Sequence, residues 1–313
     1  MNKTITNTYI HGGNEMIYNL KHVMMHQGGH EGGQAPEDCT HDCSTCGSDC
    51  PSREGGIPKA VLNENSSIKK VIGIVSGKGG VGKSMVTALS ALAATRNGYK
   101  TGIMDADITG PSIPKMFGVH TKAYGSEFGI MPEVTPTEIK LMSINLLVEN
   151  ETDPVVWRGP VIGGVVEQFW TDVCWGDLDV LFIDMPPGTG DVPLTVFQSL
   201  PVDGIIVVTS PQDLVSMIVA KAVKMAELLN IPVLGLVENM SYMTCPHCGE
   251  KIHMFGESSA EAVAAAYGIK LLEQLPIDPV LSQEADAGKI EFNEGTQMES
   301  ILGVLDDLGL KKK

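Results

Sequence analysis

The sequence predicts an α/β protein with a mainly parallel, doubly wound β-sheet, preceded by a flexible, cysteine-rich N-terminal tail. From about residue 69 onward, short and continuously apolar runs alternate with helical patterns. Continuous apolar character is typical of strands that are buried on both faces. Alternation with helices implies right-handed crossovers, with helices on both sides of the sheet. The expected strands are 71–76, 100–105, 139–147, 180–184, 204–210 and 233–237.

Two helices are expected between these strands. One, 85–94, follows the first strand, and the other, 214–229, follows the fifth. Asn230 and Pro232 are typical of the end of the second helix, because neither residue type continues a helix readily. Ligands of parallel sheets bind beyond the carboxyl ends of the strands. Polar residues at those ends are therefore the candidate site.

Residues 1–56 differ from the rest of the chain. Glycine, histidine, asparagine and acidic residues dominate there, and no hydrophobic period persists. Such a composition is typical of a disordered or loosely ordered tail. A linker at 51–58, rich in proline and glycine, leads into a body that we expect to span 57–313 as one domain.

The composition excludes several function classes. The 313 residues are 43% apolar and carry a formal charge of −16. Nucleic acid is not expected as a partner, because phosphate backbones are bound by an excess of Lys and Arg. No apolar run approaches the roughly 20 residues that span a bilayer, and no signal-peptide pattern is present. We therefore expect a cytoplasmic protein without a membrane partner, whose seven cysteines are metal ligands or catalytic thiols rather than disulfides.

A phosphate-binding loop follows the first expected strand. Residues 77–84 fit the pattern Gly-x4-Gly-Lys-Ser between a strand and a helix, which is the context that this motif requires. The glycines let backbone N–H groups turn toward phosphate oxygens, and the helix N-terminus favours the same anion. Lys83 is expected to reach the β- and γ-phosphates of ATP, and Ser84 to bind Mg²⁺. The fold is therefore of the P-loop NTPase type, with Gly77, Lys78, Gly79, Gly80, Val81, Gly82, Lys83 and Ser84 as nucleotide-binding residues.

Three carboxylates follow expected strands at the same edge of the sheet. Asp105 and Asp107 come directly after one strand, where carboxylates can hold magnesium-bound water and orient the attacking water. Asp184 ends another strand and looks like the Walker B aspartate, so we expect it to hold Mg²⁺ together with Ser84. Gly188 is expected to present its N–H to the γ-phosphate and so to sense hydrolysis.

Lys78 is unusual, because a phosphate loop needs only the lysine at position 83. The sequence of 77–84 resembles the deviant Walker A loop of the MinD/ParA/nitrogenase-reductase group of dimeric ATPases. The resemblance implies a homodimer in which Lys78 reaches the partner's nucleotide, much as an arginine finger acts in trans. It also implies that Asp107 takes part in hydrolysis and that Asn239 reads the adenine, for which an amide has both donor and acceptor. Pro276 is expected to close the base pocket.

Several ordered motifs narrow this resemblance. They are 105–114, 157–160, the stretch that follows Asp184, and 238–242 followed by Cys-x-x-Cys. Together they are similar to the Mrp/ApbC family of ATP-dependent iron–sulfur cluster carriers, over roughly residues 69–280. The resemblance implies a slow ATPase that binds a cluster and transfers it to apo iron–sulfur proteins.

Cys245 and Cys248 are spaced so that both thiolates can bind one metal centre. A zinc site needs four ligands, of which His253 would supply only a third. A thioredoxin-like pair would open a helix, whereas Pro246 and Gly249 indicate a loop. A 4Fe–4S cluster takes four thiolates, which two chains related by a two-fold axis would provide. We favour the bridging cluster, with zinc and a plain dithiol as alternatives.

A second cysteine group lies in the tail, at Cys39, Cys43, Cys46 and Cys50. Its last three cysteines, followed by proline, are similar to the end of a bacterial ferredoxin run. Eukaryotic relatives of the resembled family carry an N-terminal four-cysteine cluster with wider spacings. The shorter spacing leaves a stable 4Fe–4S cluster, zinc and a transient cluster as alternatives, of which we favour iron–sulfur.

Two other functions compete with the carrier. A positioning ATPase of the MinD/ParA type that cycles on membranes needs a basic amphipathic C-terminal helix. The C-terminus of this chain is apolar and ends in lysines, which would suit such a helix. Asp306 and Asp307, however, would be repelled by an anionic membrane surface. An ATP-dependent electron donor like nitrogenase reductase places its cluster cysteines far apart, unlike Cys245 and Cys248.

Cys174, alone between Val173 and Trp175, is expected to be a packed core cysteine.

Overall fold

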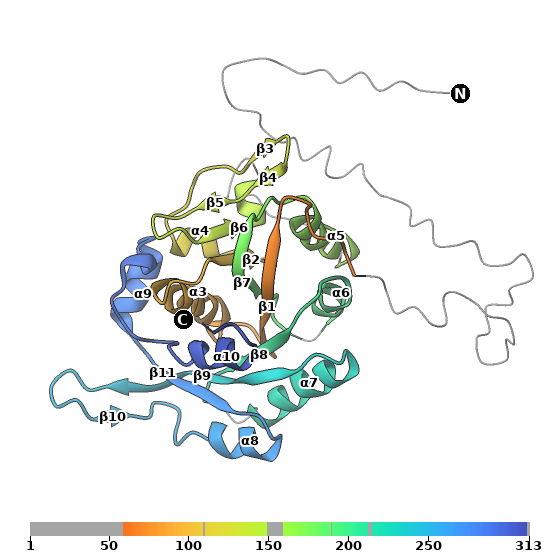
Figure 1. Cartoon of the computed structure of the whole chain (residues 1–313). Helices are drawn as coiled ribbons and strands as arrows, with labels where there is room; N and C mark the ends of the chain where they lie inside the picture. Colours follow the sequence, from red (N-terminus) through yellow and green to blue (C-terminus); the bar gives the residue numbers. More distant parts are fainter. Residues whose placement is uncertain (1–58, 109, 149–158, 189, 212–214, 312–313) are drawn as a thin grey trace, which may run out of the picture.

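A computed structural model describes residues 59–108, 110–148, 159–188, 190–211 and 215–311. Its centre is a nine-stranded sheet in the order β10-β9-β8-β1-β7-β2-β6-β5, with β11 paired to β9 (Figure 1). The strands of this sheet are β1 (Ser67–Ser76), β2 (Thr101–Asp105), β5 (Glu133–Val134), β6 (Lys140–Met142), β7 (Asp177–Asp184), β8 (Gly204–Thr209), β9 (Val233–Thr244), β10 (Lys251–Ile252) and β11 (Leu271–Pro276). A separate hairpin is formed by β3 (Tyr124–Ser126) and β4 (Gly129–Met131).

The predicted parallel sheet is confirmed. β1 pairs in parallel with β7 and β8, β2 with β6 and β7, and β9 with β8 and β11. Only the short strands β5 and β10 pair antiparallel to their neighbours in this sheet. The carboxyl ends of the long parallel strands therefore lie along one edge, where ligands of such sheets bind.

Helices cover both faces of the sheet, as a doubly wound fold requires. One face carries α5 (Gly159–Thr171), α6 (Asp191–Ser199), α7 (Val215–Leu228) and α8 (Ala260–Ala266), whose apolar residues form one core. The other face carries α3 (Lys83–Arg96), α4 (Ile113–Met116), α9 (Pro279–Asp286) and α10 (Ile301–Asp307), with a second core. Two 3₁₀ turns, η1 (Ile144–Leu146) and η2 (Ile290–Phe292), complete the described elements.

The central strands divide their side chains between these two cores. On β7, Leu181 and Ile183 belong to the core under α5–α8, whereas Val180 and Phe182 belong to the core under α3. This alternation follows from the two-residue period of a strand. It explains why the strands are continuously apolar in sequence. It also directs Asp184, two residues after Phe182, toward α3.

Several predicted elements differ from the structure in extent. β1 and β7 begin before 71 and 180, and α3 extends beyond 85–94 at both ends. The expected strand 139–147 is wrong beyond β6, because the chain turns into η1 after Ser143, whose hydroxyl donates to Asp105. β9 runs past the expected end at 237, so Asn239 lies within the strand rather than after it. The expected helix 214–229 is α7, and Asn230 follows it with a left-handed φ of 54°, a conformation that asparagine tolerates at helix ends.

The C-terminal helix belongs to the core. Ile301, Val304 and Leu305 of α10 are buried in the cluster beneath α3. Among the residues that the structure describes, no helix combines the length and the hydropathy that a bilayer span needs. The tail and the boundary predicted at 56/57 lie outside the described residues, so the division into tail and body stays a prediction.

Phe182 gives a test of the core beneath α3. Its side chain has no exposed surface. Phe182→Ala should lower the free energy of unfolding by about 3–5 kcal/mol, through lost burial and a cavity that the sheet cannot close. The measurement is urea unfolding followed by circular dichroism. Phe292→Ala, at a side chain that is 61% exposed, is the matched control and should change stability by less than about 0.5 kcal/mol. Equal losses for both variants would contradict this packing.

Candidate functional site

The phosphate loop connects the end of β1 to the first residue of α3. Gly80 and Gly82 have left-handed φ values of 77° and 76°, which side chains other than glycine rarely adopt. A Cβ at Gly82 would also lie 2.1 Å from the Asn239 amide nitrogen. A Cβ at Gly77 would lie 2.4 Å from Ile218 on α7. The glycines are therefore required both by the turn and by its packing.

A cavity of about 230 Å³ lies over this loop. Its lining residues are Ser76, Lys78, Gly79, Gly80, Val81, Gly82, Lys83, Ser84, Met85, Asp107, Ser112, Met116 and Pro187. The N-terminus of α3, which opens at Lys83, adjoins the cavity, and no acidic residue occupies the first turn of this helix. Free backbone N–H groups and the helix dipole at such a terminus attract anions. The residues therefore fit the phosphates of a nucleotide.

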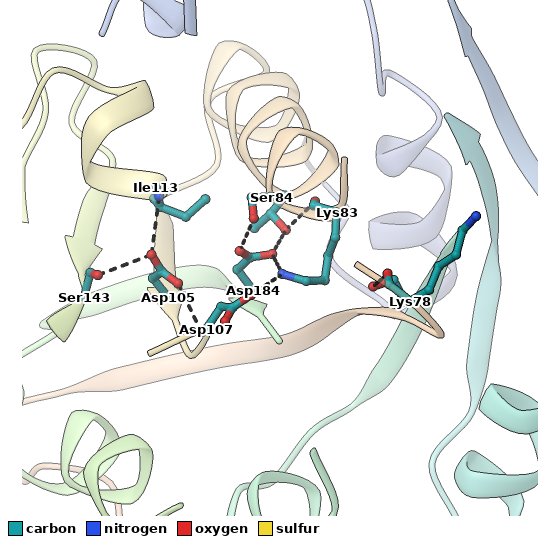
Figure 2. A network of polar contacts seen from close by, with 10 residues as sticks. Lys78, Lys83, Ser84, Asp105, Asp107, Ile113, Ser143 and Asp184 are labelled. Carbon is teal, nitrogen blue, oxygen red and sulfur yellow. Dashed lines mark hydrogen bonds and ion pairs between the residues drawn. The ribbon is translucent and has the colours of Figure 1, made fainter. Parts of the chain in front are cut away.

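Asp184 is the centre of a buried polar cluster (Figure 2). Its carboxylate has no exposed surface. Oδ1 accepts from Lys83 Nζ at 2.7 Å and from Thr87 Oγ1 at 2.9 Å, while Oδ2 accepts from Ser84 Oγ at 2.6 Å. Charge-assisted bonds of this kind are short and strong. The hydroxyl of Ser84 and a carboxylate oxygen are ligands that Mg²⁺ prefers, so the pair fits the magnesium site expected from the sequence.

Asp105 lies beside Asp184 because β2 and β7 pair with these two residues in register. Its Oδ1 accepts from the N–H of Asp107 at 3.2 Å, and its Oδ2 from the N–H of Ile113 at 3.3 Å and from Ser143 Oγ at 3.2 Å. Burial, reinforced by the nearby Asp184 charge and opposed by Lys83, raises the pKa of Asp105 to about 8. Asp105 does not line the cavity, whereas Asp107 does.

The two lysines of the loop point in different directions. Lys83 is 6% exposed, faces Asp184 and has its Nζ 3.9 Å from Asp107 Oδ2. The Lys78 side chain extends away from the Asp184 cluster, although the residue lines the cavity (Figure 2). The Lys78 carbonyl accepts a hydrogen bond from Ser76 Oγ at 3.0 Å, which holds the loop backbone. The Lys83 side chain therefore faces the Asp184 cluster, and the Lys78 side chain points away from it.

Three further residues were predicted to contact the nucleotide. Asn239 donates from Nδ2 to the Val81 carbonyl at 3.0 Å, so its amide contacts the loop itself. Gly188 donates its N–H to the Ser76 carbonyl at 2.8 Å. Pro276 ends β11 beside Tyr242. None of these three residues lines the cavity over the loop, and their adenine and γ-phosphate roles stay predictions.

The thiol pair lies apart from this cluster, on the hairpin between β9 and β10. Cys245 donates its N–H to Glu250 O at 2.8 Å, and its own carbonyl accepts from Gly249 N at 2.9 Å. The loop expected at this point is present, with a left-handed φ of 76° at Gly249. Cys245 is half-buried and Cys248 is exposed. Hydrogen bonds from the Cys248 and His247 backbone lower the pKa of Cys245, which favours the thiolate that metals bind.

No group of three His, Cys, Asp or Glu side chains that could hold a metal ion occurs among the described residues. His253 lies near the Tyr242 ring, with the two ring centroids 6.4 Å apart, and does not complete a site with the thiols. Within the described part of one chain, Cys245 and Cys248 therefore remain a two-ligand pair. The tail residues Cys39, Cys43, Cys46 and Cys50 lie outside the described residues.

Sequence reasoning placed Cys174 wrongly and missed two residues of the cluster. Cys174 is half-buried, because the local alternation puts Val173 and Trp175 inside the core. Thr87 was missed, although its place one helical turn after Lys83 puts both on the same face of α3. Ser143 carries no such local signal, because only the pairing of β2 with β6 brings it to Asp105.

Residues 67–307 match the ParA family, described as NUBPL iron-transfer P-loop NTPases. A relative from Clostridium perfringens, named iron-sulfur cluster carrier protein, is 45% identical over 252 residues, which are 77% of this chain and 88% of that protein. The chain also resembles a nucleotide-binding protein from Archaeoglobus fulgidus solved in complex with ADP, with 44% identity and a TM-score of 0.66 over 73% of this chain and 90% of that one. The MinD cell division protein of Aquifex aeolicus, 18% identical with a TM-score of 0.55 over 78% of this chain and 98% of that one, shares the fold.

Removing the Lys83 charge tests the buried ion pair. Lys83→Met should lower the free energy of unfolding by about 3 kcal/mol, because Asp184 then stays buried without its cation. The double variant Lys83→Met/Asp184→Asn should recover at least about half of this loss, since no charge is then stranded. Lys69→Met is the control, because Lys69 contacts Asp179 at the same 2.7 Å but is 62% exposed, and its loss should stay below about 1 kcal/mol. Equal losses at the two lysines would refute the assignment.

The raised pKa of Asp105 predicts a dependence of stability on pH. Between the ordinary pKa of an aspartate, 3.8, and about 8, the folded protein keeps a proton at Asp105 that the unfolded chain has lost. The stability from this group therefore falls as pH rises through that window. Asp105→Asn has no charge at either pH. From pH 5 to pH 8, its free energy of unfolding should rise relative to that of the unchanged protein by at least about 1 kcal/mol. One titrating group limits this rise to about 1.4 kcal/mol per pH unit. Urea unfolding at both pH values measures this difference, and the exposed Asp307→Asn should show no such gain.

Proposed function

The chain belongs to the ParA family of NUBPL iron-transfer P-loop NTPases, and from this premise we propose that it is an ATP-binding iron–sulfur cluster carrier. In this proposal, two copies of the chain hold one 4Fe–4S cluster as cargo and pass it to apo iron–sulfur proteins. ATP hydrolysis is slow and sets the conformation of the carrier rather than driving metabolism. The names of the relatives support the carrier role, and the ADP complex of the A. fulgidus protein supports the nucleotide.

The observation that carries the proposal is an incomplete ligand set. Cys245 and Cys248 are accessible on a hairpin, and no third ligand joins them among the described residues. A 4Fe–4S cluster takes four thiolates, and an isologous dimer brings two identical pairs to its two-fold axis. A cluster held by two ligands from each chain is easier to release than one caged in a single chain. A half-buried and an exposed thiol on one hairpin therefore suit a carrier.

The nucleotide machinery follows from the same geometry. The loop glycines and Lys83 would bind the phosphates of ATP, and Ser84 and Asp184 would hold Mg²⁺, which neutralises charge on the β- and γ-phosphates when bound. Asp107, which lines the cavity, would orient the attacking water. The direction of Lys78 away from its own Asp184 supports a role toward the nucleotide of a second copy.

The tail cysteines and the two competing functions remain to be considered. Cys39, Cys43, Cys46 and Cys50 of the tail would bind a second iron–sulfur cluster, on the strength of their spacing alone. The positioning-ATPase alternative receives less support, because the similarity to MinD is limited to the fold. The apolar side chains of α10 also pack into the core, so they are not available to bind a membrane. Cys245 and Cys248, with two residues between them, do not resemble the widely separated cluster cysteines of nitrogenase reductase.

Iron content tests the carrier proposal. The full chain is reconstituted anaerobically with iron and sulfide, and iron, sulfide and zinc are counted per chain. Cys245→Ser should remove about two iron atoms per chain, half of one four-iron cluster shared by two chains. It should also abolish cluster transfer to an apo acceptor. Cys174→Ser is the matched control, because Cys174 is a lone, half-buried thiol, and it should leave the iron count unchanged.

The oligomeric state and the nucleotide complete the same experiment. The cluster-loaded protein should have the mass of a dimer, and Cys245→Ser should return it to single subunits under the same conditions. Transfer rates should differ with and without ATP, and Lys78→Ala should remove this difference while nucleotide still binds. An iron count that Cys245→Ser does not change, or a loaded protein that remains a single subunit, would overturn the proposal.

A further inference from the structure

β9 contains a bulge between the nucleotide loop and the thiol pair. Gln274 of β11 lies opposite Glu238, and Pro276 lies opposite Tyr242. β9 therefore uses two more residues than β11 over this interval. Met240 within the bulge has a left-handed φ of 59°, which is costly for a residue other than glycine. Bulges of this kind re-aim side chains next to functional sites.

The buried carboxylate of Glu238 holds the bulge at its base. Glu238 has no exposed surface. Its Oε2 accepts from Ser241 Oγ at 2.6 Å, on the far side of the bulge, and from Gln274 Nε2 at 2.8 Å, on the neighbouring strand. One carboxylate oxygen thus ties both ends of the irregular segment to β11. The strain at Met240 persists because these bonds constrain the chain around it.

The bulge places Asn239 against the phosphate loop. Asn239 Nδ2 donates to the Val81 carbonyl at 3.0 Å, and its Oδ1 accepts from Met240 N at 2.9 Å. The same amide packs where Gly82 has no side chain. A movement of the loop backbone at Val81 therefore acts directly on β9 at the bulge.

The other end of β9 leads without interruption into the thiol hairpin. Met243 and Thr244 pair with β10, and Cys245 follows at once. Five residues of one strand, 240–244, thus separate the loop contact at Asn239 from Cys245. A change in the bulge would be carried toward the hairpin by the same continuous strand.

A second arrangement of the bulge is available to the carboxylate. Glu238 Oε1 and Thr209 Oγ1 are both buried and, among the described residues, have no hydrogen-bond partner. The two residues lie opposite each other on β9 and β8, so their side chains share one face of the sheet. A Thr209 hydroxyl rotated toward Oε1 would keep two donors on Glu238 when the Ser241 hydroxyl leaves Oε2. Coupling between sites requires an element with two such arrangements.

We propose that Glu238 is a positioning residue that couples the phosphate loop to the Cys245 and Cys248 thiols through the bulge at 239–241. This inference rests on the proposed function, because it explains how nucleotide would alter cluster binding. It also has a consequence that needs no cluster. Nucleotide bound at the loop changes the exposure of the two thiols in the cluster-free protein.

Thiol alkylation measures this consequence. The full, cluster-free chain is treated with iodoacetamide, with and without Mg²⁺ and a non-hydrolysable ATP analogue at saturation, and the rate at each cysteine is read by peptide mass spectrometry. Nucleotide should change the rate at Cys245 or Cys248 by about fivefold or more, the lower end of usual allosteric couplings. Cys174, a half-buried thiol between α5 and β7, is the internal reference and should change less than about twofold.

Three variants locate the coupling. Ser241→Ala removes one donor to Glu238 and should reduce the nucleotide effect to less than about twofold, while nucleotide affinity and unfolding midpoint stay within the range of the control. Ser241→Thr restores the hydroxyl and should restore the effect. The control, Ser126→Ala, makes the same substitution at the distant β3–β4 hairpin, where Ser126 donates to the Gly129 carbonyl at 3.0 Å, and should leave the effect intact. A lost effect that Thr restores cannot arise from general loosening of the fold.

The outcomes separate this inference from the carrier proposal. A nucleotide effect that persists in Ser241→Ala overturns the role of Glu238, whatever the iron count shows. Thiol rates that bound nucleotide leaves unchanged in the unmodified protein overturn the coupling as well. Loss of iron on Cys245→Ser together with either result leaves the carrier function standing without this route.

Discussion

The ion pair between Lys83 and Asp184 is the interaction on which the nucleotide site depends. Its atoms lie 2.7 Å apart at positions with almost no exposed surface. Burying two charges is costly, and hydrogen bonds from Ser84 and Thr87 offset part of that cost. The pair joins the first turn of α3 to the carboxyl end of β7. The loop between β1 and α3 is thereby held over the edge of the sheet.

The same pair determines the state of its neighbours. Lys83 pairs with Asp184. Asp105 is therefore buried beside the Asp184 carboxylate and has no cation paired with it among the described residues. Its raised pKa follows from that position, and it makes Asp105 a hydrogen-bonded support rather than an exposed ligand. Asp107, two residues later, reaches the cavity instead. Two carboxylates only two positions apart therefore differ in burial and in access to the cavity.

The nucleotide loop and the thiol pair are linked by β9. This strand contacts the loop through Asn239, contains the bulge held by Glu238, and ends beside Cys245. A carrier must bind its cargo firmly in one state and release it in another, which requires that one ligand alter the affinity for the other. A continuous strand with a local irregularity provides a short physical path for that coupling.

The sequence by itself determined the parallel α/β fold, the phosphate loop, the carboxylates at the strand ends and the spacing of the thiol pair. These features depend on local periodicity and on residue spacing, which neighbouring residues express directly. Only the tertiary structure decided that Asp105 is buried, that Ser143 ends β6 with a turn, and that Glu238 holds a bulge in β9. Each of these depends on the register between strands far apart in the chain, and register is a property of packing that no local pattern contains.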